Sequence, residues 1–185
     1  MMDELSLNIL DVAQNSITAG ATLVEIAIEE DTVRDTLTIL IRDNGCGMSE
    51  EAAMRAADPF YTTRKTRKVG LGLPFLKMAA EMTGGCFSIE SSVGSGTSVR
   101  ASFGRSHIDR APLGDMAGTI TSLVMHRPDI DFVYTHSLDG AGFALDTREV
   151  RRMMEGISIA SPEVIAWMSE FISENQKEIY GGASK

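Results

Sequence analysis

The residues Asp43-Asn44-Gly45-Cys46-Gly47-Met48 constrain the fold of this chain more than any other stretch. They follow the apolar run 36–41, which has the composition of a mostly buried strand. The pattern therefore predicts that the carboxylate of Asp43 stands at a strand end above a tight glycine turn. Gly45 and Gly47 would let a flat ligand lie against bare backbone. The same pattern is also an ordinary β-turn sequence, so its meaning depends on the rest of the chain.

The chemistry of Asp43 favours one class of ligand if this turn is a site. A carboxylate at a strand end can accept a hydrogen bond from an exocyclic amine, which adenine supplies. The same carboxylate discriminates against a ring that carries a carbonyl at that position. A purine pocket and a plain turn are the two interpretations at this point.

Length and composition predict a globular protein outside membranes. A chain of 185 residues can bury a sizeable core. No apolar run approaches the roughly 18 residues of a membrane span, and no signal segment is recognisable. Cys46 and Cys86 lack metal-ligand spacing, so we expect free thiols and a cytoplasmic protein. The net charge of −9 argues against nucleic-acid binding.

The first helix is predicted from about Asp3 to Thr18 and carries two stripes. The apolar stripe consists of Leu5, Ile9, Val12, Ala13 and Ile17. The polar stripe consists of Glu4, Asn8, Asp11 and Asn15. The polar stripe is either the wet face of the helix or a site, because an Asn oxygen and a carboxylate one turn earlier could hold Mg²⁺ and orient a water.

Two strands, 22–28 and 34–41, are predicted next, joined by an acidic loop at Glu29-Glu30-Asp31. A helix followed by an antiparallel strand pair favours an α+β two-layer sandwich over a Rossmann unit, in which strands and helices alternate. A short helix with Ser49 as its N-cap should follow and end at Asp58-Pro59.

The stretch 60–73 has the features of a phosphate site. It contains four cations (Arg64, Lys65, Arg67 and Lys68) and runs into Gly70-Leu71-Gly72 at the start of a predicted helix. A helix start behind small residues presents free backbone N–H groups to an anion. We expect the cations to form a mobile lid over phosphates, with a solvated charged loop as the alternative. The chain has neither a P-loop nor a full dinucleotide fingerprint.

These motifs, in this order, resemble the GHKL superfamily of ATP-binding domains, which unites histidine kinases, MutL-type repair proteins, type II topoisomerase ATPases, a chaperone family and anti-sigma-factor kinases. The matching segments are Asp11–Asn15 (N box), 43–47 (G1 box), 58–63 (F box), 70–73 (G2 box) and the final Gly94-Ser95-Gly96-Thr97. The resemblance implies a Bergerat-type fold, in which helices cover one face of a mixed or antiparallel sheet.

The resemblance also implies Mg-ATP as the ligand, with a role for each matching residue. Asn15 would hold Mg²⁺ bound to the phosphates, Asp43 would receive the adenine amine, and Thr97 would support Asp43. The remaining residues implied at the nucleotide are Gly45, Gly47, Thr63, Lys65, Gly70, Leu71 and Gly72.

Two departures from the family bear on chemistry. The ATPase branches have a Glu as general base where this chain has Asp11, which is shorter by one methylene, and Thr18 replaces a second acid. A base displaced by about 1 Å can lower a rate on the order of 10²-fold. Asp11 is therefore the candidate general base, while hydrolysis itself stays open.

Residues 105–185 do not match the family's usual end. We expect 1–104 to form the ATP-binding domain and 105–185 an α/β extension packed on it. The extension is predicted to contain a hairpin around Asp139-Gly140 and a last helix that starts at Ser161-Pro162-Glu163. We expect it to cover what a strand and a helix before the N box cover in the family. His107, His126 and His136 are interpreted as ordinary residues and not as phosphoacceptors.

Three functions are open at this point. The first is a kinase-like module that transfers phosphate to, or controls, a separate protein. The second is a slow stand-alone ATPase, and the third is an ATP-gated interaction protein without catalysis. The protein partner is unidentified, and a homodimer is one candidate assembly.

Overall fold

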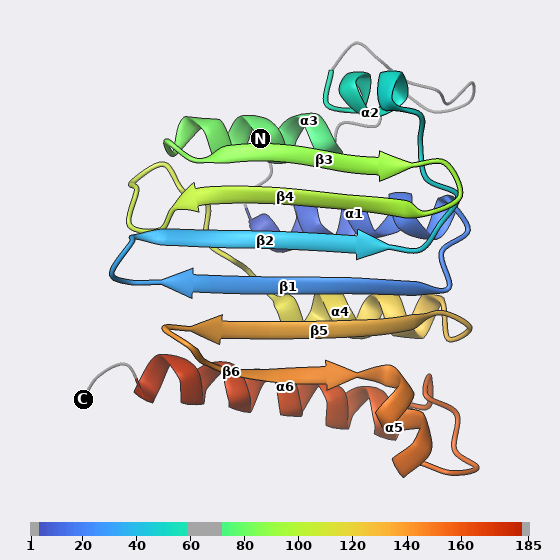
Figure 1. The fold of residues 1–185 in the computed structure, drawn as a ribbon. Helices are drawn as coiled ribbons and strands as arrows, with labels where there is room; N and C mark the ends of the chain where they lie inside the picture. Colours follow the sequence, from blue (N-terminus) through green and yellow to red (C-terminus); the bar gives the residue numbers. More distant parts are fainter. Residues whose placement is uncertain (1–3, 59–71, 183–185) are drawn as a thin grey trace.

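The computed structural model describes residues 4–58 and 72–182 of the 185-residue chain. Its strands are β1 (Leu23–Asp31), β2 (Thr36–Asp43), β3 (Cys86–Ser92), β4 (Gly96–Gly104), β5 (Asp131–Leu138) and β6 (Ala141–Asp146). They form one six-stranded sheet in the order β3-β4-β2-β1-β5-β6 (Figure 1). β1 and β5 run parallel, and all other neighbours are antiparallel, so the sheet is mixed.

Among residues 4–58 and 72–182, helices cover one face of this sheet and none lies on the other. The helices are α1 (Leu5–Thr18), α2 (Glu50–Ala56), α3 (Gly72–Met82), α4 (Met116–His126), α5 (Thr147–Met153) and α6 (Pro162–Gly182). In Figure 1, α1, α3, α4 and α6 lie behind the sheet, while α2 lies beside the β3 edge and α5 beside the β6 edge. The predicted α+β two-layer sandwich of Bergerat type is therefore confirmed.

The core lies between the sheet and this helix layer. Successive strand residues point to opposite faces, and on β1 and β2 the alternate apolar side chains are buried. The buried set includes Val24, Ile26, Ile28, Leu37, Ile39 and Ile41 from these strands, and Leu5, Ile9, Val12 and Ala13 from α1. Burying one such Val, Leu or Ile side chain contributes about 1.5–3 kcal/mol. Packing of the predicted apolar stripe thus fixes α1 across the sheet.

The predicted acidic loop at Glu29-Glu30-Asp31 is wrong, because these residues are the end of strand β1. β5 pairs with β1 as far as Glu30 and holds this segment extended. Glu30 points into the protein and is only 6% exposed. The sequence suggested a loop because three acids in a row are rare in a buried strand, and the partners of Glu30 lie far away in the chain.

The residues after 104 add β5 and β6 to the sheet beside β1 and continue the helix layer with α4 and α6. The predicted hairpin around Asp139-Gly140 is present, and the last helix begins at Pro162. The division of the chain at residue 104 stays a prediction, because one sheet runs through both parts. Among the helices of the described residues, none is long and apolar enough to span a membrane.

Candidate functional site

The carboxylate of Asp43, the last residue of β2, is held by two uncharged donors. Ser16 Oγ on α1 donates to Asp43 Oδ2 at 2.6 Å, and the Gly45 backbone N–H donates to Oδ1 at 2.9 Å. No basic side chain of the described residues lies within 4.0 Å as an ion-pair partner. Asp43 is half-buried, and a carboxylate offers about four acceptor positions. Acceptor capacity therefore remains for a ligand.

The glycines after Asp43 allow a close approach between two strand ends. A Cβ on Gly47 would lie 1.9 Å from the Ser92 carbonyl oxygen, and a Cβ on Gly96 would lie 1.9 Å from the Asp43 carbonyl oxygen. Both glycines have positive φ, 64° and 93°. The glycine turn thus seats the end of β2 directly on the turn between β3 and β4.

Thr97 and Asp43 lie directly opposite each other on β4 and β2. The Thr97 hydroxyl lies 2.9 Å from Ser91 Oγ, which also accepts a hydrogen bond from the Met48 backbone N–H at 2.8 Å. The hydroxyl that binds the Asp43 carboxylate belongs to Ser16, which the sequence interpretation did not select. The sequence signal for Ser16 is only its place on the apolar stripe, four residues after Val12 and three after Ala13, and in the structure its side chain is 4% exposed.

Asp11 lies where α1 meets the first residue of α3. A Cβ on Gly72 would lie 2.9 Å from Asp11 Cβ and 3.5 Å from Asp11 Oδ2, so only a glycine fits against this carboxylate. Burial raises the pKa of Asp11 above its ordinary value. Asn15 lies one turn further along α1, about 6 Å in rise, next to Ser16. One helix thus contacts both the Asp43 turn and the start of α3.

The predicted polar stripe on α1 is not simply a wet face. Asn8 is only 3% exposed, and its Oδ1 has no hydrogen-bond partner within the described residues. Leaving a buried acceptor unpaired costs about 1–3 kcal/mol. The ridge that carries Asp11 and Asn15 is therefore partly buried.

Four of the predicted site residues, Thr63, Lys65, Gly70 and Leu71, lie outside the described residues, as do the lid cations Arg64, Arg67 and Lys68. The structure places the other predicted residues on α1, at the end of β2, at the start of β4 and at the first residue of α3. Within the described residues, no group of three His, Cys, Asp or Glu side chains could hold a metal ion.

A second polar cluster lies at the other end of the sheet, around the buried Glu30. Its carboxylate accepts hydrogen bonds from Tyr180 (2.5 Å), Arg105 Nε (2.8 Å) and His136 Nε2 (3.1 Å). Burial opposes ionisation of Glu30, but these hydrogen bonds outweigh burial and lower the pKa of Glu30 to about 2. His136 is fully buried and belongs to this cluster, in agreement with a core role.

Comparisons with known proteins agree with this geometry. The family model described as "Histidine kinase-, DNA gyrase B-, and HSP90-like ATPase" matches residues 1–107. A putative sensor protein of Shewanella frigidimarina is 34% identical over 97 residues, and a probable C4-dicarboxylate sensor kinase of Bacillus subtilis is 37% identical over 75 residues. These matches cover 51% and 40% of this chain but only 15% and 14% of the two relatives.

Two solved structures share the fold at low sequence identity. The N-terminal domain of a DNA repair protein has a TM-score of 0.54 at 17% identity and covers 78% of this chain and 52% of that one. The ATPase domain of MutL from Aquifex aeolicus, complexed with ADP, has a TM-score of 0.50 at 14% identity and covers 84% and 70%. These neighbours show the architecture alone.

Proposed function

Because the chain belongs to the histidine kinase-, DNA gyrase B- and HSP90-like ATPase family, we propose that it binds Mg-ATP and acts as a kinase-like regulatory module on a separate protein. One observation carries the proposal. The Asp43 carboxylate is oriented by Ser16 and Gly45 and keeps free acceptor capacity above a glycine turn. The curated relatives named as sensor proteins or kinases support the kinase-like part, although the chain spans about one seventh of their length.

The adenine amine fits the chemistry of Asp43. Ser16 and Gly45 fix the plane of the carboxylate, so its remaining lone pairs have a defined direction. An exocyclic amine donates into such lone pairs, whereas a carbonyl oxygen at the same place would face a second acceptor. The pocket should therefore prefer ATP to GTP.

Asn15 and Asp11 supply oxygen atoms one helical turn apart, which fits a hard cation such as Mg²⁺. Mg²⁺ usually binds through one or two protein oxygens together with waters and phosphate oxygens, so the lack of a larger acidic cluster is compatible with it. When bound, the ion supplies charge neutralisation at the phosphates. In this proposal Asn15 holds the ion, and the start of α3 at Gly72 faces the phosphates.

A slow ATPase is the second candidate, and Asp11 is the observation that favours it. The raised pKa of Asp11 brings the carboxylate closer to the range in which a general base works. Its short side chain requires that a water bridge the gap to the γ-phosphate. Phosphoryl transfer depends mainly on positioning and on cations at the phosphates. Asn15→Ala should therefore abolish ATP turnover, whereas Asp11→Asn should only lower it.

Calorimetric titration of the Asp43→Asn variant with Mg-ATP tests the binding site. Gly45 N–H and the adenine amine would then compete for a single amide oxygen, and affinity should fall by about 1–3 kcal/mol, roughly 5- to 150-fold. Asp31→Asn, the same substitution at the far end of the hairpin formed by β1 and β2, should bind as the natural chain does. Undiminished affinity of Asp43→Asn would exclude this adenine site.

Incubation with γ-labelled ATP, alone and with lysate of the source organism, separates the functions. Label on another protein supports the kinase-like module, and loss of that label in Asn15→Ala ties it to this site. Label released only as free phosphate supports the ATPase. Binding without either product supports the ATP-gated interaction protein.

A further inference from the structure

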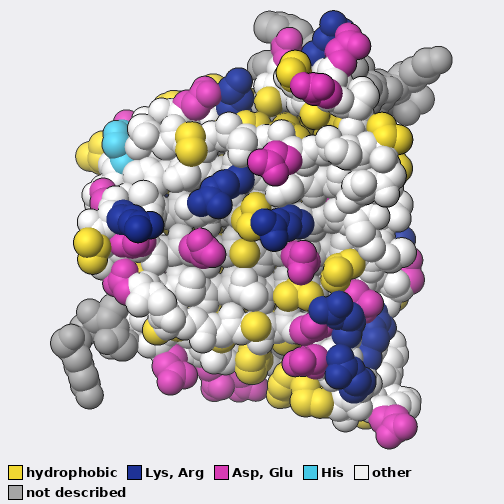
Figure 2. Space-filling view, viewed as in Figure 1, with side chains coloured by type: hydrophobic (Ala, Val, Ile, Leu, Met, Phe, Trp, Pro, Cys, Tyr) yellow, Lys and Arg dark blue, Asp and Glu magenta, His cyan; other side chains and the backbone are white. Residues whose placement is uncertain are grey.

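The open face of the sheet is the largest surface that the site does not use. Within the described residues no helix covers this face, as Figure 1 shows. In Figure 2 hydrophobic side chains lie near its centre among charged side chains of both signs. Its strands include the parallel pair of β1 and β5, and parallel strands are usually covered on both faces.

Near the middle of this face acidic and basic side chains occur in equal numbers, although the whole chain has a net charge of −9. Glu25 and Glu29 point outward from β1, Arg42 from β2 and Arg100 from β4, and all four are exposed. Within the described residues none of them forms an ion pair within 4.0 Å. Glu25 and Glu29 thus lie on one side of the line between β1 and β2 and the two arginines lie on the other, while a further exposed acid, Glu90, lies at the rim on β3.

We propose that this face is an interface between two copies of the chain, related by a two-fold axis that runs parallel to the strands between β1 and β2. In the sheet, Glu25 lies directly opposite Arg42, and Ala27 lies opposite Leu40. The axis places β1 of one copy over β2 of the second copy. Glu25 therefore meets Arg42 of the second copy, and Arg42 meets its Glu25, so the centre of the face is complementary to itself in charge.

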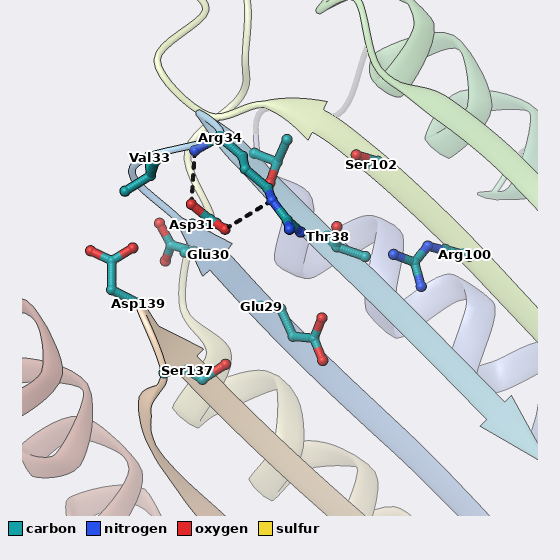
Figure 3. A pocket seen from close by; sticks show the side chains of 12 residues that line it. Glu29, Glu30, Asp31, Val33, Arg34, Thr38, Arg100, Ser102, Ser137 and Asp139 are labelled. Atoms are coloured by element: carbon teal, nitrogen blue, oxygen red, sulfur yellow. Dashed lines mark hydrogen bonds and ion pairs between the residues drawn. The ribbon is translucent and has the colours of Figure 1, made fainter.

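The same axis matches long side chains with short ones. Leu40 meets Ala27 of the second copy, Glu29 meets its Thr38, and Arg100 meets its Thr135, by the observed strand register. Figure 3 shows Glu29, Thr38 and Arg100 extending from neighbouring strands on this face. Stacked sheets lie about 10 Å apart, which such alternation of long and short side chains allows.

The centre of the face suits a second copy better than the rim does. A shallow hollow of about 120 Å³, bounded in part by Glu25, Leu40 and Arg42, lies beside the proposed axis. At the rim Glu90 meets Asp146 of the second copy, but Arg148 already binds that carboxylate at 2.7 Å. The opposite-charge pairs of Glu25 and Arg42 lie next to the axis, and they would fix how the two sheets are aligned along the strands.

The area of the face is sufficient for a stable dimer. Six strands about 4.8 Å apart and about 8 residues long, at about 3.3 Å a residue, give a flat area of roughly 750 Å². A standard protein interface buries about 800 Å² on each partner. A dimer that uses most of this face would therefore have an ordinary interface.

Sedimentation equilibrium of the full chain without nucleotide tests this proposal separately from ATP binding. The natural chain should sediment at about 40 kDa, twice its 20.0 kDa. Arg42→Glu and Glu25→Arg should each raise the dimer dissociation constant at least about tenfold, because each places like charges together twice. Mixing these two variants should restore a dimer, since the mixed pair again has two opposite-charge contacts.

Arg152→Glu and Glu174→Arg make the same charge changes at exposed positions on α5 and α6 and should leave the mass unchanged. Circular dichroism of every variant checks that the fold is retained. A natural chain that stays monomeric at micromolar concentrations would overturn the proposal. A dimer that ignores both charge reversals, or a mixture that stays monomeric, would overturn it as well.

Discussion

Two carboxylates at opposite ends of the hairpin formed by β1 and β2 have opposite fates. Glu30, at the end of β1, is buried and accepts hydrogen bonds from an arginine, a histidine and a tyrosine. Asp43, at the end of β2, is half-buried and accepts one hydroxyl and one backbone N–H. Both side chains lie on strands and point toward the helix layer. Their partners distinguish them.

The two acids differ in how many of their acceptor positions are filled by donors of the protein itself, and this distinguishes a structural acid from a candidate binding acid. Glu30 has three donors, one of them cationic, and joins residues of β1, β5, α6 and the segment after β4. Three of its roughly four acceptor positions are used and the side chain is buried, so Glu30 stabilises the fold and is poorly placed to bind a ligand. Asp43 is positioned by two uncharged donors, so about half of its acceptor positions remain open. Three substitutions, one of them also followed as a function of pH, test this difference.

The largest effect is expected from Glu30→Gln. The pKa of Glu30 lies at about 2 against an ordinary 4.5, and one pKa unit corresponds to about 1.4 kcal/mol, so ionised Glu30 contributes roughly 3 kcal/mol at pH 7. Urea unfolding should show a loss of about this size, with ATP affinity unchanged. Glu174→Gln, an exposed acid on α6, is the control. A loss below about 1 kcal/mol would mean that the three hydrogen bonds to Glu30 do not stabilise the fold as described.

The pH dependence of this loss is a second prediction. Because the folded pKa of Glu30 lies below the unfolded one, the folded state binds fewer protons, and the stabilisation is present above about pH 4.5. It should disappear as the pH falls toward 2. The difference in unfolding free energy between the natural chain and Glu30→Gln should therefore shrink across this range. A difference that stays constant from pH 7 to 2.5 would assign the loss to packing.

The contrast also shows what the sequence could predict. The G1 turn is local, since Asp43, Gly45 and Gly47 are neighbours in the chain, and their geometry follows from the types of residue. The first helix and the C-terminal hairpin were predicted for the same reason. Each depends on hydrophobic periodicity and turn residues within a short window.

The Glu30 cluster could not be predicted, because its partners are distant in sequence. Tyr180 lies 150 residues after Glu30, and His136 lies 106 residues after it. Three consecutive acids therefore suggested a loop. Ser16 was missed for a related reason, since its bond to Asp43 spans 27 residues and depends on how α1 crosses the sheet. A contact that depends on the angle at which a helix crosses the sheet cannot be predicted from the local sequence.

A smaller effect is expected from Ser16→Ala. The variant removes the 2.6 Å hydrogen bond that orients Asp43 Oδ2, and the ATP affinity should fall about tenfold, or about 1.4 kcal/mol. The unfolding free energy should fall by about 1 kcal/mol, less than in Glu30→Gln. Titration calorimetry and urea unfolding measure the two effects. Ser122→Ala on α4 is the control. Unchanged ATP affinity would show that Asp43 needs no orienting hydroxyl.

Asp11→Asn should have the smallest effect on the apoprotein, and in the opposite direction. The raised pKa of Asp11 means that burial disfavours its charged form, so the folded state binds protons more readily and stability falls as the pH rises through the folded pKa. A neutral Asn removes this cost, and the variant should melt at a higher temperature than the natural chain at pH 7. If Asp11 is the base of a slow ATPase, then any hydrolysis should fall while ATP binding stays the same. Unchanged melting and unchanged hydrolysis together would leave Asp11 as an ordinary polar residue of α1.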